Sequence, residues 1–226
     1  MKILVIDVGG THVKMLLSGK RQHIEFDSGP GLTAKAMVAK VKKATAEAGW
    51  KYDVIAMGYP GPVAHCHPMA EPHNLGPGWV GFDFHHGFGC PIRIINDAAM
   101  QALGSYRGGR MLFLGLGTGL GSALIVDSVL EPMELAHLPF KKGKTYEDFV
   151  GLKGLKRLGK KKWRKSVVEA MRQLRGATQA EYVVLGGGNS RLMKRLPPYA
   201  RLGDNTNAFR GGFRLWDDKH KTRTCP

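Results

Sequence analysis

Two glycine-rich turns in this sequence carry groups that could hold a chain of phosphates. The first is Asp-Val-Gly-Gly-Thr at residues 7–11, directly after the apolar run 2–6. The second is Gly-Leu-Gly-Thr-Gly-Leu-Gly-Ser at residues 115–122, directly after the apolar run 111–114. Glycine permits a positive φ and lets backbone N–H groups come close to an anion. Two such turns, each with a threonine and one with an aspartate, predict two halves that close on phosphates from opposite sides.

Three further polar residues, Asn96, Asp97 and Asn189, lie at or just after the ends of predicted strands. Asp97 lies at a strand-to-helix junction, directly after Asn96. An aspartate there either caps the helix or projects into a cleft, and its position alone leaves both readings open. A late Gly-Gly-Gly-Asn at residues 186–189 follows another apolar strand.

The elements that must position these groups can be read from the hydrophobic periodicity. A strand, a glycine turn and a second strand occur once in each half, which predicts a structural duplication without an obvious sequence repeat. The boundary is expected between about 97 and 109, and no linker separates the halves, so we expect them to share a cleft. Strands are expected over 2–7, 13–18, 23–28, 53–59, 92–95, 111–115, 122–127 and 182–185, and helices over 33–48, 97–103, about 146–158, 161–175 and from near Asn189.

Four motifs in order resemble one family of sugar kinases. They are Asp-x-Gly-Gly-Thr at 7–11, Asn-Asp-Ala at 96–98, Leu-Gly-Thr-Gly-Leu-Gly-Ser at 116–122 and Gly-Gly-Gly at 186–188. Together they resemble the ROK (repressor, open reading frame, kinase) family, and within it the polyphosphate glucokinase branch, over Asp7 to about Trp216.

The resemblance implies an α/β chain with the actin-like ATPase (ribonuclease H-like) fold, in which two similar α/β domains surround a cleft. The N-terminal domain would span 1–104 and carry the first phosphate loop and the catalytic aspartate. The C-terminal domain would span 105–226 and carry the second loop and the basic helices, with a last helix that can pack back on the N-terminal domain.

The resemblance also implies roles at the phosphate side of the cleft. Asp7 would hold Mg²⁺ through water, and Asp97 would act as the general base that takes the proton of the sugar 6-hydroxyl. Amides of both glycine turns and the Thr118 hydroxyl would cradle the phosphates. The expected phosphate- and cofactor-binding residues are Asp7, Gly9, Gly10, Thr11, Lys14, Gly117, Thr118, Gly119, Gly121, Gly186, Gly187, Gly188 and Asn189.

The sugar side is implied by a second element, Glu-Leu-Ala-His at residues 134–137. It resembles the family's Glu-x-Gly-His, whose acid and histidine contact sugar hydroxyls. Ala136 replaces the family glycine, which puts the local backbone and the turnover rate in doubt. The expected substrate-binding residues are Asn74, Asn96, Asp97, Glu134, His137 and Glu147.

Zinc is not expected. Many relatives carry a cysteine-rich zinc loop soon after the histidine, whereas residues 140–144 here are Phe-Lys-Lys-Gly-Lys. The spacing of Cys66 with the nearby histidines at 65, 67, 73, 85 and 86 fits no standard zinc set, so these are read as exposed loop residues. The sequence starts at its first strand, so the helix-turn-helix of the repressor relatives is not expected either.

The composition is that of a soluble globular protein. The chain has 226 residues, of which 43% are hydrophobic and 23% charged, and no apolar run is long enough to cross a membrane. Asp7 follows the first strand too soon for a signal peptide. Three cysteines without a close pair argue against a disulfide framework, so we expect a cytoplasmic protein.

The net charge of +16 is concentrated in the last third of the chain. Residues 1–140 hold 12 Lys and Arg against 11 Asp and Glu, residues 141–175 hold 13 against 3, and residues 191–226 hold 9 against 3. The excess is either a solvated face that aids solubility or a site for a polyanion. The second reading predicts a polyphosphate track at Lys160, Lys161, Lys162, Arg164 and Lys165, continued by Lys153, Lys156 and Arg157.

These observations predict a Mg²⁺-assisted kinase that moves a phosphoryl group from inorganic polyphosphate, or also from ATP, to the 6-hydroxyl of glucose. The alternatives are a strictly ATP-dependent hexose or N-acyl-hexosamine kinase and a catalytically silent protein that senses sugar or binds polyanions. Glucose and polyphosphate are the expected partners, and neither nucleic acid nor a membrane is expected. A homodimer is expected only because homodimers are common in the family.

Overall fold

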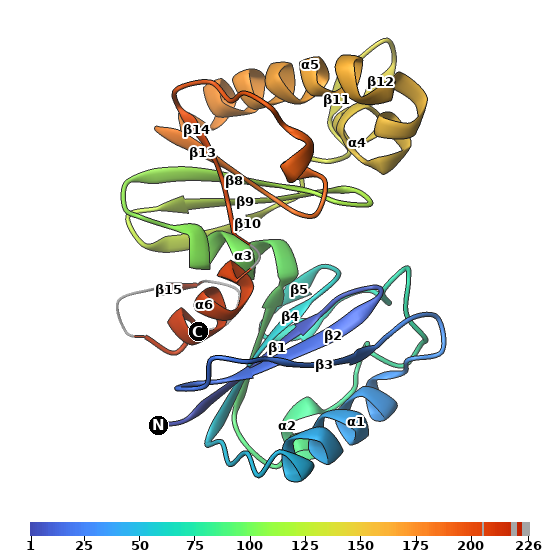
Figure 1. Cartoon of the computed structure of the whole chain (residues 1–226), viewed down its shortest axis with the longest axis vertical. Coiled ribbons are helices and arrows are strands. Elements are labelled where there is room, and N and C mark those ends of the chain that lie inside the picture. The colour runs from blue at the N-terminus through green and yellow to red at the C-terminus, as the bar shows by residue number, and fades with distance from the viewer. Residues whose placement is uncertain (205, 218–220, 223–226) are drawn as a thin grey trace.

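The computed structural model describes residues 1–204, 206–217 and 221–222. Two β-sheets lie one above the other, with helices α3 and α6 between them (Figure 1). The N-terminal part of the chain forms the lower half and most of the C-terminal part forms the upper half. Two similar α/β halves were expected, and this arrangement confirms that expectation.

The first sheet has the strand order β3-β2-β1-β4-β7. Strand β1 pairs antiparallel with β2 and parallel with β4, which in turn pairs parallel with β7. Because β1, β4 and β7 are parallel, their carboxyl ends meet at one edge of the sheet. The strands are β1 (Ile3–Val8), β2 (His12–Leu17), β3 (Ile24–Asp27), β4 (Val54–Tyr59) and β7 (Ile92–Asn96).

The second sheet repeats this arrangement in the order β10-β9-β8-β13-β14, with β15 added beside β10. Strand β8 pairs antiparallel with β9 and parallel with β13, and β13 pairs parallel with β14. Each glycine turn therefore joins the first two strands of its own sheet, as the duplication predicted. The strands are β8 (Arg110–Leu116), β9 (Leu120–Val126), β10 (Val129–Met133), β13 (Tyr182–Gly186), β14 (Ala200–Leu202) and β15 (Lys221–Thr222).

Helices and short hairpins cover the two sheets. In the first half, α1 buries Met37, Val38 and Val41 in one core with residues of β1 and β4. In the second half, α5 buries Trp163 and Met171 in a core with β8 and β13. These elements are α1 (Ala34–Glu47), α2 (Phe84–Phe88), α3 (Asp97–Ser105), α4 (Tyr146–Val150), α5 (Leu152–Thr178), η1 (Ser190–Leu192), α6 (Asn207–Arg214), and the hairpins β5 (Val63–Ala64) with β6 (His67–Pro68) and β11 (Pro139–Lys141) with β12 (Lys144–Thr145).

The basic helices agree with the sequence in part, because the helix expected over about 146–158 is broken at Gly151 into α4 and the start of α5. Gly159 has φ 71° within α5, so the helix is broken between two basic stretches near the expected place. The helix expected from Asn189 is wrong, because only the single 3₁₀ turn η1 forms there. The chain then runs through Pro197 and Pro198, which cannot donate helical hydrogen bonds, into β14.

Helices α3 and α6 cross so closely that their backbones touch. A side chain on Gly104 of α3 would collide with the Asn207 carbonyl of α6, and one on Gly211 of α6 would collide with the Met100 carbonyl of α3. Helix α6 also packs on the first sheet, because Gly212 lies against Val5 of β1. The end of the chain thus completes the core of the N-terminal half.

The structure also bears on two expectations from the sequence, unpaired cysteines and the lack of a membrane span. Cys66 is disulfide-bonded, contrary to the expectation that the cysteines stay unpaired, while Cys90 is a free thiol. Cys225 lies outside the described residues. Among the residues described, no helix combines the length and the apolar character that a membrane span requires.

Candidate active site

Two carboxylates face each other at the edge where the strands of the first sheet end. Asp7 lies near the end of β1 and pairs in register with Gly58 of β4, which pairs with Ile95 of β7. Asp97 directly follows the last residue of β7 and is the first residue of α3. Gly58 has no side chain to stand between them, so the two acids share one space.

The surroundings of this pair favour the protonated acids. Burial, and to a lesser extent the nearby Asp7 charge, raise the pKa of Asp97 from 3.8 to about 7. Burial also raises the pKa of Asp7 to about 6, against the opposing effect of Lys14. Lys14 is the register partner of Asp7 on β2. A carboxyl group whose pKa is near neutrality can accept a proton during turnover and release it afterwards.

Asn96, and not Asp97, caps helix α3. The Asn96 Oδ1 accepts hydrogen bonds from the N–H groups of Ala98 at 2.9 Å and Ala99 at 3.2 Å. Its Nδ2 donates to the Gly61 carbonyl at 3.0 Å, which leaves one amide hydrogen for a ligand. The capping reading of Asp97 therefore loses its basis. One Asp97 oxygen accepts from Ala98 N–H at 2.8 Å, and the other has no partner among the described residues.

The first glycine loop presents two free amides. Gly9 N–H donates to the His12 carbonyl at 3.0 Å, so it is used within the turn. The N–H groups of Gly10 and Thr11 have no acceptor among the described residues. Ser28, which the sequence analysis did not include, donates from Oγ to the Gly9 carbonyl at 2.6 Å and so fixes the loop.

In the second glycine loop, one backbone N–H group is bonded within the loop and two others have no acceptor among the described residues. Gly117 N–H donates to the Gly119 carbonyl at 3.2 Å, whereas the amides of Thr118 and Gly119 have no acceptor within the described part of the chain. The late glycine turn supports this loop, because Asn189 Nδ2 donates to the Gly117 carbonyl at 3.0 Å. The predicted residues at 117–119 and 186–189 are thus brought together.

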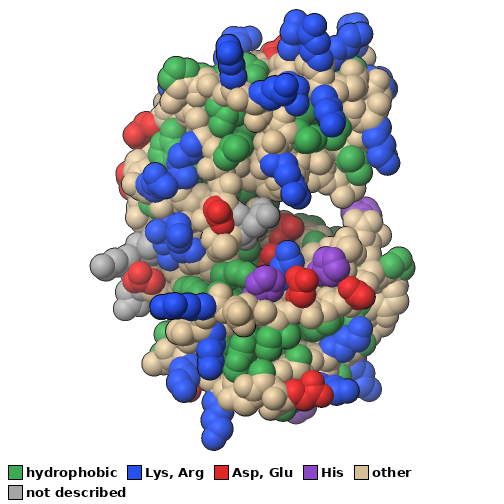
Figure 2. Space-filling view, in the orientation of Figure 1, with side chains coloured by type: hydrophobic (Ala, Val, Ile, Leu, Met, Phe, Trp, Pro, Cys, Tyr) green, Lys and Arg blue, Asp and Glu red, His purple; other side chains and the backbone are tan. Residues whose placement is uncertain are grey.

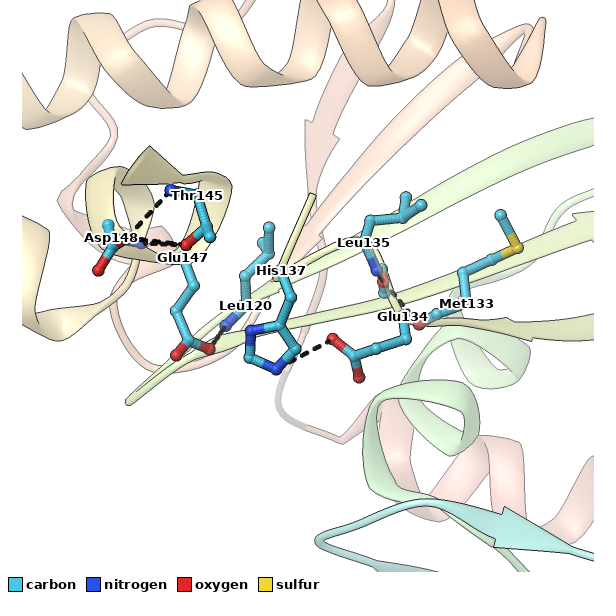
Figure 3. A network of polar contacts seen from close by, with 9 residues as sticks. Leu120, Met133, Glu134, Leu135, His137, Thr145, Glu147 and Asp148 are labelled. Carbon is cyan, nitrogen blue, oxygen red and sulfur yellow. Dashed lines mark hydrogen bonds and ion pairs between the residues drawn. The ribbon is translucent and has the colours of Figure 1, made fainter. Parts of the chain in front are cut away.

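The Glu147 side chain lies next to the second loop, with its carboxylate beside Leu120 (Figure 3). Its carboxylate accepts a hydrogen bond from Leu120 N–H at 3.2 Å. Its own N–H donates to the Ala136 carbonyl at 3.0 Å. A Cβ on Gly119 would collide with the Glu147 carboxylate, so a side chain there would displace this carboxylate from its present position. Glu147 therefore links the glycine loop to the 134–137 element.

The predicted sugar ligands of that element point toward one another (Figure 3). His137 Nε2 lies 4.0 Å from Glu134 Oε1, and the side chains are 74% and 73% exposed, so both are accessible to a ligand. Ala136 is buried in the core of the second half, and its methyl group faces away from solvent.

Ser122 on β9 is a positioning residue that sequence reasoning missed. Its Oγ donates to the Met133 carbonyl at 2.7 Å and accepts from Leu135 N–H at 3.2 Å. Glu134 lies between these two anchored residues. A serine at the end of a glycine motif looks like part of the loop, and only the tertiary contact shows that it holds the Glu134 segment.

Gly121 brings the second loop against helix α3. A Cβ on Gly121 would lie 2.7 Å from the Ala98 Cβ, next to Asp97. We expect Gly121→Ala to push α3 from β9, to lower the free energy of unfolding by about 1–3 kcal/mol and to lower kcat. Adding Ala98→Gly removes the opposing methyl group and should restore kcat. Chemical denaturation and steady-state kinetics measure both effects, and a double variant no better than Gly121→Ala would contradict this contact.

The basic residues of α5 lie outside this cluster, on the upper half of the molecule where Lys and Arg side chains gather (Figure 2). The helix begins at the second loop, since Leu152 N–H donates to the Thr118 carbonyl at 3.1 Å. Lys160, Lys161 and Lys162 are exposed, whereas Arg164 Nε donates to the Leu192 carbonyl at 2.6 Å.

A cavity of about 590 Å³ lies farther along α5, between the helix and the segment that follows η1. It has an apolar floor that includes Val168, Met193 and Tyr199. Five cations line it as well, and three of them extend the predicted track. The five are Arg164, Lys165, Arg172, Lys194 and Arg195.

Comparisons with known proteins agree with this architecture. The ROK family profile matches residues 3–131. The chain belongs to the ROK family. A polyphosphate glucokinase of Mycobacterium tuberculosis (strain ATCC 25177 / H37Ra) is 27% identical over 216 residues, which cover 85% of this chain and 80% of that protein.

Solved structures show the fold of this ROK chain. The inorganic polyphosphate/ATP-glucomannokinase from Arthrobacter sp. strain KM superimposes with a TM-score of 0.77 at 22% identity, over 93% of this chain and 96% of that one. A ROK family glucokinase from Streptomyces griseus, in complex with glucose and AMPPNP, gives a TM-score of 0.68 at 16% identity, over 93% and 97%. The expected actin-like fold is thereby confirmed.

Proposed function

We propose that this protein is a sugar kinase that transfers a phosphoryl group from inorganic polyphosphate to the 6-hydroxyl of glucose. The observation that carries the proposal is the Asp7–Asp97 pair at the strand ends, with two glycine loops that offer free amides. The similarity to the mycobacterial polyphosphate glucokinase supports the substrate and the donor.

Asp97 would act as the general base. Its free carboxylate oxygen would accept the proton of the 6-hydroxyl as the hydroxyl oxygen attacks phosphorus. Phosphoryl transfer needs positioning and charge neutralisation more than covalent chemistry. Glu134, His137 and Asn74 would orient the sugar, and the amides of Thr118 and Gly119 would bind the donor phosphates.

Asp7 suits a magnesium ion. Mg²⁺ takes oxygen ligands and is usually held by one or two carboxylates together with substrate phosphates. The partly buried Asp7, with the second acid Asp97 beside it, matches that donor set of carboxylate oxygens. Among the described residues, no three His, Cys, Asp or Glu side chains gather into a denser metal site. When bound, the ion would neutralise the negative charge of the donor phosphates.

The donor is proposed from the charge distribution. A polyphosphate chain would leave the second loop where α5 begins and follow its exposed lysines to the cations around the cavity. ATP remains a second donor candidate, because the turn at residues 186–189 is intact and bonded to the second loop. The Arthrobacter relative is named for both donors.

The test is a coupled assay of glucose phosphorylation with polyphosphate, ATP or GTP at two salt concentrations. We expect polyphosphate to be used and its KM to rise steeply with salt, as polyanion binding does. Product from ATP alone would favour the strictly ATP-dependent alternative, with N-acyl-hexosamines as further acceptors to test. No product from any donor with any hexose would overturn the kinase and favour a silent binding protein.

We expect the triple change of Lys160, Lys161 and Lys162 to Ala to raise the KM for polyphosphate more than that for ATP. The exposed lysines contact only a donor long enough to reach them, so long chains should be affected more than short ones. Replacement of Arg172, Lys194 and Arg195 should act on long chains alone. A matched control is Lys35→Ala on exposed α1, in the other half. Equal losses with ATP and polyphosphate would mean that these cations serve solubility only.

The proposal includes three coarser features. The domain division at 104/105 follows the change from the first sheet to the second along the chain. The homodimer rests on the family resemblance, and analytical ultracentrifugation measures it. A cytoplasmic location rests on the similarity to glucokinases, since the disulfide at Cys66 removes the argument from unpaired cysteines.

A further inference from the structure

One carboxylate outside the proposed machinery holds a loop that reaches the first glycine turn. Glu71 accepts hydrogen bonds from Trp79 N–H at 3.1 Å and 3.2 Å and from Val80 N–H at 3.2 Å. These bonds and one from Gly78 N–H lower the pKa of Glu71, with Trp79 N–H contributing most, so it is ionised at neutral pH. The carboxylate thus closes the segment 72–78 into a loop.

Both ends of this loop are tied to the core of the first half. Before it, Tyr59 donates its hydroxyl hydrogen to the Ala70 carbonyl at 2.7 Å. After it, Trp79 is fully buried and donates from Nε1 to the Leu32 carbonyl at 3.3 Å. Between these anchors, Leu75 N–H donates to the Pro72 carbonyl at 3.4 Å, Gly76 N–H donates to the Leu32 carbonyl at 3.0 Å, and the Leu75 side chain is buried in the core of the first half. The exposed residues His73 and Asn74 make no backbone hydrogen bond within the described part of the chain, so their position depends on the anchors on both sides.

The exposed part of the loop carries Asn74 to the proposed site. A Cβ built on Gly10 would lie 3.2 Å from the Asn74 Cβ and 3.5 Å from its Nδ2. Asn74 therefore lies against the loop whose free amides face the phosphates. Its side-chain amide is exposed and has no hydrogen-bond partner among the described residues, so it is available to a ligand.

We propose that Glu71 is a positioning residue: by binding the amides at 78–80 it holds Asn74 against Gly10, where Asn74 contacts the sugar. This rests on the proposed function, since Asn74 is a sugar ligand only if the cleft binds a hexose. Glu71 does not touch the substrate and acts only through the loop. Removing it lets Asn74 sample other positions, so the sugar is bound more weakly before any chemistry occurs.

The experiment measures glucose affinity by calorimetry and glucose KM and kcat by the coupled assay for Glu71→Ala, Glu71→Gln, Asn74→Ala and the double variant Glu71→Ala/Asn74→Ala. We expect Glu71→Ala to raise the dissociation constant and the KM for glucose about five- to ten-fold, while kcat stays within about two-fold. This is the pattern expected when an interaction that is equally strong in the ground state and the transition state is lost. Glu71→Gln keeps one acceptor oxygen and should lie between. The double variant should bind no more weakly than Asn74→Ala, because Glu71 acts through Asn74.

Asp53→Asn is the matched control. Its carboxylate accepts from Lys2 N–H at 2.6 Å at the opposite end of the same sheet, so its loss tests a general destabilisation. It should lower the melting temperature without changing glucose affinity. Unchanged affinity in both Glu71 variants, or effects of Glu71→Ala and Asn74→Ala that multiply, would overturn the inference. Glucose binding without phosphorylation would contradict the kinase alone, and no hexose binding at all would overturn both proposals.

Discussion

The Asp97→Asn variant is expected to lose about a thousand-fold in kcat while it still binds glucose, because general-base catalysis typically contributes 10²–10⁴-fold. Asparagine has nearly the same shape but cannot accept the hydroxyl proton. Asn96 caps α3, so the helix start does not depend on Asp97. The loss should therefore be chemical and not structural.

Single-turnover kinetics measure the loss of the chemical step, and glucose calorimetry measures whether glucose binding is retained. The matched control is Glu47→Gln, which removes an exposed carboxylate of α1 that is 3.9 Å from Lys43. It should leave kcat unchanged. If Asp97→Asn retained more than about a tenth of the activity, Asp97 would not be the base that general acid–base catalysis requires here.

The same substitution is expected to change thermal stability. At pH 8, the Asp97→Asn variant should have a higher melting temperature than the unaltered protein. The pKa of Asp97 rises from 3.8 to about 7 in the native state, so that state binds a proton that the unfolded chain has released. The contribution of this carboxyl group to the free energy of unfolding is then fully present below pH 3.8 and is lost as the pH rises through about 7. Asparagine avoids this loss because it carries no charge.

Differential scanning calorimetry in EDTA at pH 4 and pH 8 measures the difference. We expect little difference between the proteins at pH 4 and a clear one at pH 8, where each kcal/mol corresponds to about 2–4 °C. Mg²⁺ added at pH 8 should raise the melting temperature of the unaltered protein more than that of the variant. The same difference at both pH values would contradict a carboxylate whose charge destabilises the fold.

The positions of the two glycine loops and of Asp97 could be predicted because they depend on local patterns. Apolar runs of strand length ended at glycines, and parallel strands place their carboxyl ends at one edge. Asp7 and Asp97 are 90 residues apart in sequence, yet strand order brings them together. That order was not read from the residues but followed from the family resemblance.

The supporting contacts could not be predicted, because they join residues that are distant in sequence. Glu71 and Ser122 are ordinary polar residues in the sequence, and only the tertiary structure shows which amides they bind. A last helix that packs back on the N-terminal half was expected from the resemblance, but the residues alone did not give the bounds of α6, because Gly211 and Gly212 lower its helix propensity. Strand β10 was not expected from the sequence, because it contains Pro132, and proline is rare within strands.

The close crossing of α3 and α6 has a consequence for synthesis of the protein. Gly212 of α6 covers Val5 of β1, and Trp216 Nε1 donates to the Ile55 carbonyl of β4 at 3.1 Å. The first sheet leaves the ribosome early, but the helix that covers Val5 emerges only after 200 or more further residues have been made. The N-terminal half therefore waits with an exposed apolar face, a stage at which a chaperone would bind it and a premature stop before residue 207 would leave it unfinished.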